Sequence, residues 1–97
     1  MEIEVIDIEN YAKEGKTPPA GKKYQIRVDN AKFITEKESL TGREILELAG
    51  KFPVEKFQLN QKIKGGQVKR IDYREVVSFI APGVERFMTV PLDQTEG

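Results

Sequence analysis

The side chains that most often carry out catalysis at neutral pH are missing from this chain. It contains no cysteine and no histidine, so it has no thiolate nucleophile, no disulfide and no imidazole to act as a general base or metal ligand. Catalysis by the chain itself would have to rest on carboxylates, lysines or hydroxyls, and no pair of these stands out. We therefore expect no enzyme active site, no metal site and no cofactor.

Two short stretches resemble ligand-binding motifs, but neither one supports a binding site. Gly15-Lys16-Thr17 matches the end of a phosphate-binding loop, yet Asn10 stands where the first glycine of such a loop is required. The second stretch is a basic cluster without an aromatic residue, made of Lys62, Lys64, Lys69 and Arg70. We expect this cluster to be a solvent-exposed hairpin, because basic runs of this kind usually form solvated surfaces.

Charge and hydropathy give no sign of a nucleic-acid or membrane partner. The 97 residues include 16 Lys and Arg and 16 Asp and Glu, so the net charge is zero. No apolar run approaches the roughly 20 residues of a membrane helix, and the N-terminus lacks the apolar segment of a signal peptide. We expect one small domain located in the cytoplasm.

The clearest structural signal in the sequence is a helix over residues 41–50. Thr41 is a typical N-cap, and Glu44 follows three residues later, which completes a capping box. Leu40 and Ile45 stand at the two positions of a hydrophobic staple. The helix should therefore begin at Thr41.

The apolar face of this helix should bury itself against a sheet, because a helix of fewer than three turns is unstable alone in water. The face contains Ile45, Leu48 and Ala49 at helical spacing, with Leu46 beside them. Gly50 favours a left-handed stop, and Pro53 follows shortly after it.

The residues on both sides of the helix predict strands. Polar and apolar residues alternate before it, a glycine pair marks a tight hairpin after it, and Ile71-Asp72-Tyr73 predicts a corner. The expected strands are residues 24–28, 32–35, 56–61, a short hairpin around Gly65-Gly66, and 84–90. This order predicts an α+β fold in which a mixed sheet wraps around one main helix, which is the layout of the β-grasp fold.

The last strand has apolar residues on both of its faces. Phe87 lies on one face, whereas Met88 and Val90 lie on the other. Because only one face can contact the helix, Met88 and Val90 either form a partner-docking face or are covered by another part of the chain.

The chain divides into three parts. Residues 1–21 combine an acidic and aliphatic segment with a linker rich in proline and glycine. They form either a flexible leader or a strand that docks on a partner or on a sheet edge. Residues 22–91 make up the domain, and residues 92–97 form an extended tail that ends in glycine.

Over residues 24–92 the chain resembles the bacterial multiubiquitin-domain family. Members are ubiquitin-like proteins encoded beside ubiquitin-type activating and conjugating enzymes and a JAB-type metallopeptidase. The segments that carry the resemblance are residues 24–29, 40–46 with Gly50, and 83–87. Ile71-Asp72-Tyr73 is also similar to the corner that precedes the last strand of ubiquitin.

The resemblance implies a protein modifier that is not itself an enzyme. In such systems the C-terminal carboxylate is adenylated, passed as a thioester to enzyme cysteines and transferred to a target protein, and Gly97 matches the reacting position. The activating enzyme and the peptidase would engage the tail, which contains Leu92, Asp93, Gln94, Thr95 and Glu96. This tail departs from the ubiquitin pattern, because it is acidic and ends in a single glycine.

Two other functions fit the same residues. A non-conjugated interaction module would use the Met88 and Val90 face and the N-terminal segment for docking, and it would tolerate any substitution of Gly97. A β-grasp sulfur carrier would convert the same carboxylate into a thiocarboxylate, although such carriers usually end in a glycine pair.

Overall fold

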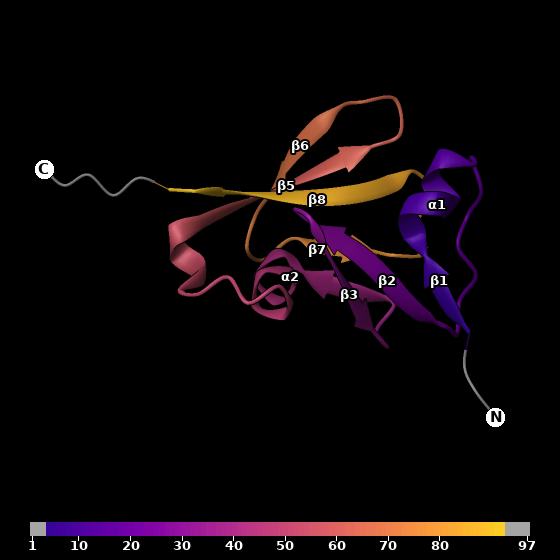
Figure 1. Ribbon diagram of the computed structural model, residues 1–97, viewed down its shortest axis with the longest axis horizontal. Helices are drawn as coiled ribbons and strands as arrows, with labels where there is room; N and C mark the ends of the chain where they lie inside the picture. The colour runs from indigo at the N-terminus through magenta and orange to yellow at the C-terminus, as the bar shows by residue number, and fades with distance from the viewer. Residues whose placement is uncertain (1–3, 93–97) are drawn as a thin grey trace, which may run out of the picture.

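The computed structural model describes residues 4–92 and contains two sheets, two helices and one 3-10 turn (Figure 1). The main sheet runs in the order β1-β2-β8-β5-β6, and β3 pairs with β2. Its strands are β1 (Val5–Asp7), β2 (Lys23–Val28), β3 (Ala31–Thr35), β5 (Phe57–Ile63), β6 (Val68–Ile71) and β8 (Val84–Pro91). The remaining elements are β4 (Ser39–Thr41) paired with β7 (Val76–Ser78), α1 (Ile8–Lys13), α2 (Gly42–Leu48) and η1 (Val54–Lys56).

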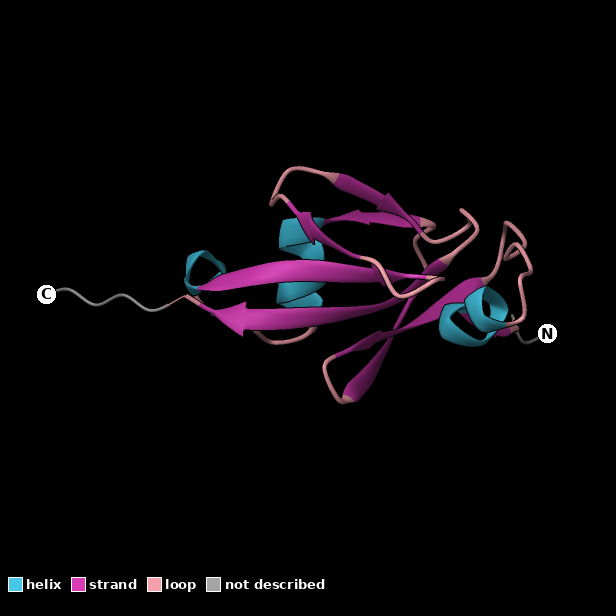
Figure 2. Cartoon of the chain, turned by 90° about the horizontal axis from the view of Figure 1, so that it is seen from above, coloured by secondary structure: helices cyan, strands magenta, loops and turns pink. Residues whose placement is uncertain are grey.

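The predicted α+β, β-grasp layout is confirmed. The sheet is mixed, because β2 pairs in parallel with β1 and β8 whereas β3, β5 and β6 pair in antiparallel fashion. In the view of Figure 2 the helix α2 lies across the two long central strands. The predicted hairpin around Gly65-Gly66 joins β5 to β6, and both glycines adopt positive φ angles of 101° and 93°.

The start of α2 follows the prediction in detail. The Glu44 N–H donates to the Thr41 hydroxyl at 3.2 Å, and the Thr41 N–H donates to the Glu44 carboxylate at 2.9 Å. This reciprocal pair satisfies two N–H groups that have no partner inside the helix. Gly50 lies just beyond the helix with φ of 74°, which is the left-handed conformation expected after a helix end.

The buried face of α2 differs from the predicted one. Ile45 and Leu46 are both fully buried, whereas Leu48 and Ala49 are only half-buried. The reason is that α2 ends at Leu48, so Ala49 already lies beyond the helix. Ala49 lines an open hollow beside the turn after β2. Leu46, predicted at the edge of the stripe, therefore belongs to its centre.

A corner at residues 71–75 holds the N-terminus of α2. The Gly42 N–H donates to the Glu75 carbonyl and the Arg43 N–H to the Tyr73 carbonyl, each at 3.0 Å. The Tyr73 hydroxyl donates to the Phe57 carbonyl at 2.7 Å, which attaches the same corner to β5. The corner predicted at Ile71-Asp72-Tyr73 thus supplies the acceptors that the first turn of the helix needs.

The N-terminal segment forms a strand and a helix between Val5 and Lys13. These residues are therefore not the flexible leader that was one of the two expectations for residues 1–21. Its strand β1 pairs with β2 along the edge that β8 leaves free, because β2 and β8 pair only at Val28 and Phe87. The helix α1 packs against both β2 and β8 (Figure 1). The other expectation was a strand that docks on a partner or on a sheet edge. The strand β1 docks in this way on β2 of its own chain. The domain limits 22–91 and 92–97 stay predictions.

One core joins all of these elements. It is formed by Ile6, Ile8, Tyr24, Ile26, Val28, Leu40, Ile45, Leu46, Val54, Leu59, Ile71, Val77, Phe79, Val84 and Phe87. The N-terminal segment contributes two of these side chains, each 1% exposed. Truncation of this segment would therefore open the core to water.

Candidate functional site

The base of the C-terminal tail is fixed to the domain. The Leu92 N–H donates to the Lys56 carbonyl at 2.8 Å, one residue after the end of β8. Pro91 lies opposite Phe57 in the β5–β8 ladder. Figure 1 shows this end of β8 on the side of the molecule opposite to the start of β1.

Most of the predicted tail site lies outside the described residues. Of its members, Leu92 is described and half-buried. The remaining members are Asp93, Gln94, Thr95, Glu96 and Gly97. Their roles in activation and conjugation stay predictions.

Met88 and Val90, predicted as a partner-docking face, lie beside polar neighbours on β5. Val90 is 44% exposed and pairs with Gln58, whereas Met88 is half-buried and pairs with Asn60. Directly paired residues share one face of a sheet, so the apolar side chains alternate with two amides, which also contact each other at 3.0 Å. The face is mixed in polarity, and a docking role for it stays a prediction.

A cluster of polar contacts around Asp29, near the end of β8, was not predicted. Asp29 accepts hydrogen bonds from the Thr89 N–H at 2.8 Å and from the Thr89 hydroxyl at 2.5 Å, and it pairs with the Lys51 ammonium at 3.4 Å. Burial raises the pKa of Asp29, but the bonds from Thr89 and the contact with Lys51 outweigh this effect and hold the pKa below its ordinary value.

The Asp29 cluster joins three parts of the chain at the base of the tail. It connects the turn after β2, the end of β8 and the segment after α2. The only local signal was the Asp29-Asn30 turn pair, which fits the left-handed backbone of Asp29 at φ of 56°. Its partner Thr89 is 60 residues away, so no local pattern could reveal the contact.

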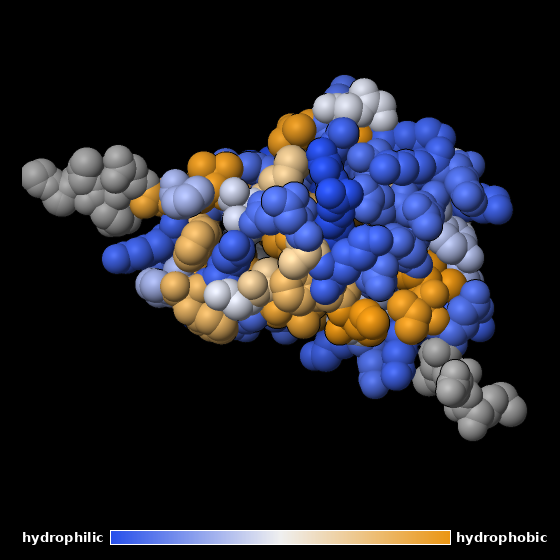
Figure 3. Space-filling model, viewed as in Figure 1, coloured by the Kyte–Doolittle hydropathy of each residue, from blue (hydrophilic) through white to orange (hydrophobic). Residues whose placement is uncertain are grey.

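An open hollow of about 310 Å³ lies beside this cluster. Its lining consists of Val28, Asp29, Asn30, Ala31, Phe33, Ala49 and Lys51. In the view of Figure 3, apolar residues gather mainly across the lower half of the molecule. The two charged members of the lining already pair with each other, so the hollow offers an apolar surface and not an acid–base pair.

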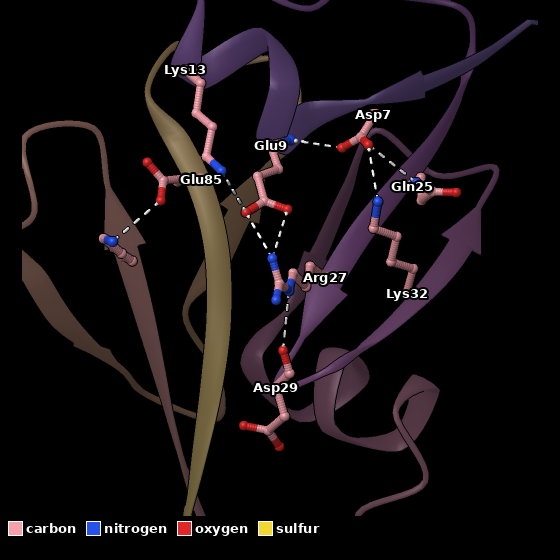
Figure 4. A network of polar contacts seen from close by, with 9 residues as sticks. Asp7, Glu9, Lys13, Gln25, Arg27, Asp29, Lys32 and Glu85 are labelled. Carbon is pink, nitrogen blue, oxygen red and sulfur yellow. Dashed lines mark hydrogen bonds and ion pairs between the residues drawn. The ribbon is translucent and has the colours of Figure 1, made fainter.

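A second network attaches the N-terminal segment to the sheet (Figure 4). Glu9 on α1 is 5% exposed, and its carboxylate contacts the Arg27 guanidinium at 3.2 Å and the Lys13 ammonium at 3.4 Å. Asp7 on β1 contacts the Lys32 ammonium at 3.5 Å. Burying an unpaired carboxylate costs free energy, so these ion pairs allow α1 and β1 to pack against the sheet.

Within residues 4–92, no group of histidine, cysteine, aspartate and glutamate side chains is arranged to hold a metal ion. The helices in that range are also too short and too polar to cross a membrane. The side chains that the structure does bring together, at Asp29 and at Glu9, join elements of the fold to one another.

The multiubiquitin family model matches residues 24–91. The chain belongs to the multiubiquitin family. The match begins in β2 and ends with β8, so it spans α2 and most of the main sheet but leaves out β1 and α1. No curated protein and no solved structure matches the chain. Multiubiquitin domains are ubiquitin-like, and domains of this kind typically serve as modifiers or modules and not as enzymes.

Proposed function

We propose that this multiubiquitin protein is a protein modifier that is joined to its targets through the carboxylate of Gly97. The observation that carries the proposal is the family match over residues 24–91, which ends where β8 ends. The Leu92 N–H is bonded to the Lys56 carbonyl, so the folded domain reaches to the first residue of the tail. An enzyme can therefore bind the domain and the tail from one end of the molecule.

The chemistry requires only a carboxylate from this chain. A carboxylate oxygen of Gly97 attacks the α-phosphorus of ATP, and pyrophosphate leaves. A cysteine thiolate of the activating enzyme then attacks the acyl adenylate, and AMP leaves. After transfer to a second enzyme thiol, a nucleophile of the target attacks the thioester and releases the thiol. Glycine suits the reacting position, because a residue without a side chain can enter a narrow channel.

The partners that we propose are those that the resemblance to the multiubiquitin family implies. They are a ubiquitin-type activating enzyme, a conjugating enzyme, a JAB-type metallopeptidase that removes the modifier, and the target proteins, all in the bacterial cytoplasm. We expect the three enzymes to be encoded beside this protein. The tail contains Asp93 and Glu96 and no basic residue, so the groove that binds it should be basic.

Intact-mass spectrometry tests the proposal directly. The protein is incubated with ATP, Mg²⁺ and the activating enzyme, and a thiol-sensitive adduct joined through Gly97 is the expected product. Gly97→Ala should fold normally and form this adduct much more slowly, whereas Lys37→Ala, at an exposed position outside the tail, is the control and should react at the normal rate. An enzyme that turns over ATP but forms the adduct equally fast with Gly97→Ala would contradict the proposal.

A non-conjugated interaction module is the second candidate function. Phe52 is 64% exposed and Val90 is 44% exposed, and both belong to segments near the base of the tail. Exposed apolar side chains of this size are common at docking surfaces. In the same experiment this candidate predicts no adduct, whereas replacement of one oxygen by sulfur in the presence of a sulfur donor would indicate a sulfur carrier.

A further inference from the structure

The strand β6 forms one end of the main sheet. It pairs with β5 and, in the described part of the chain, with no other strand (Figure 1). An edge strand presents a row of unpaired N–H and C=O groups to its surroundings. Val68, Lys69 and Arg70 are exposed, and Val68 has 59% of its surface accessible. The edge is therefore open to another extended segment.

The hairpin that carries this edge is strongly basic. Residues 62–71 include four basic side chains and no acidic one, namely Lys62, Lys64, Lys69 and Arg70. Glu85 contacts Lys62 at 3.5 Å, and Glu75 contacts Lys69 at 2.9 Å. Arg70 forms no ion pair with any residue in the range 4–92, whereas the Lys64 ammonium lies beside Gly15, in the loop after α1. The edge thus keeps the positive charge of Arg70, which its own surroundings do not neutralise.

The strand β1 shows which kind of segment this protein accepts at a sheet edge. It pairs in parallel with β2, and its aliphatic Ile6 is 1% exposed. Two acidic residues beside Ile6 pair with lysines of the neighbouring chain segments. Glu4 lies 3.8 Å from Lys22, just before β2, and Asp7 lies 3.5 Å from Lys32 on β3. An acidic and aliphatic strand is therefore held by backbone pairing, apolar burial and ion pairs together.

We propose that the free edge of β6 binds an extended acidic and aliphatic segment of a partner protein by strand addition. The partner backbone continues the sheet, an aliphatic side chain covers Val68, and a carboxylate pairs with Arg70. The positive charge of Arg70 opposes the pairing of two β6 edges, which makes the edge selective for acidic strands over a second copy of itself. This inference goes beyond the proposed modifier function and does not involve the tail.

Nuclear magnetic resonance of the ¹⁵N-labelled full chain provides the test. The probe is a capped six-residue peptide of alternating glutamate and valine, and its addition should shift the amide signals of residues 68–71. Arg70→Glu should weaken binding by about tenfold, because it turns an attraction into a repulsion. Lys37→Glu, at an exposed lysine before β4, is the matched control and should change binding by less than about twofold.

Two further peptides separate strand addition from simple charge attraction. Methylation of alternate backbone nitrogens removes the donors along one edge of the peptide, and it should abolish binding although the charge is unchanged. A peptide with lysine in place of glutamate should not bind. Equal binding of the methylated or the lysine peptide, shifts confined to β3 or to Met88 and Val90, or no shift at about 1 mM peptide would each overturn the proposal.

Discussion

Replacement of Gly42 by alanine is a sharp test of how α2 packs against the 71–75 corner. A Cβ atom at Gly42 would overlap the Asp72 carbonyl oxygen and lie 3.1 Å from the Ile71 side chain. Because the overlapped atom belongs to the backbone, it cannot move aside as the end of a flexible side chain could. The helix or the corner would have to shift.

Two opposing effects decide the outcome. Alanine favours a helix over glycine by about 1 kcal/mol, which by itself predicts a more stable protein. Overpacking costs about 1–3 kcal/mol, and a shift would also weaken the bonds from the Gly42 and Arg43 N–H groups, each worth about 0.5–1.5 kcal/mol. We expect the steric effect to win and the free energy of unfolding to fall by about 2 kcal/mol.

Urea denaturation followed by circular dichroism measures this loss. With a slope of about 1–2 kcal/mol per molar urea, the midpoint should fall by about 1–2 M. Gly50→Ala is the matched control, because a Cβ there meets nothing within 4 Å and only the φ of 74° is unfavourable. That control should lose about 1 kcal/mol. An unchanged or raised midpoint for Gly42→Ala would refute the packing of α2 against this corner.

Two other predictions concern burial and charge. Leu46→Ala should lower the free energy of unfolding by about 2–5 kcal/mol and Leu48→Ala by clearly less, because only Leu46 is fully buried; similar losses in thermal or urea melts would contradict the buried face described for α2. The lowered pKa of Asp29 means that its contribution to stability is present above the unfolded pKa of about 3.9 and is lost as the pH falls through the lower folded pKa. Asp29→Asn should therefore reduce stability at pH 7 and flatten its loss below about pH 4 in the same melts, and an unchanged pH profile would contradict the role given to Asp29.

Local patterns were sufficient to predict the helix and most of the strands. The capping box of Thr41 and Glu44 and the stop at Gly50 each depend on residues within a few positions of one another. The alternation along β2 and the glycine pair between β5 and β6 are equally local. The fold class followed because these elements have few ways to cover the apolar face of one short helix.

The N-terminal segment shows where local patterns fail. Its aliphatic and acidic residues have no helical or strand period, and β1 and α1 have only three and six residues. Their stability depends on the gap between β2 and β8 and on the contact of Glu9 with Arg27, 18 residues away. The local contacts of this segment, the Asp7 cap and the Glu9–Lys13 ion pair, are too few to stabilise so short a helix without its distant partners.

The sequence by itself determined the resemblance to the family, the main helix, the strands that correspond to β2, β3, β5, β6 and β8, and Gly97 as the proposed reacting residue. Only the tertiary structure decided that Leu46 and not Leu48 is buried, that Asp29 joins Thr89 across 60 residues, and that the Leu92 N–H is bonded to the Lys56 carbonyl. The physical reason is the range of the interactions. Caps, turns and periodicity act between neighbours in the chain, whereas burial, ion pairs and strand edges depend on which distant segments the fold brings together.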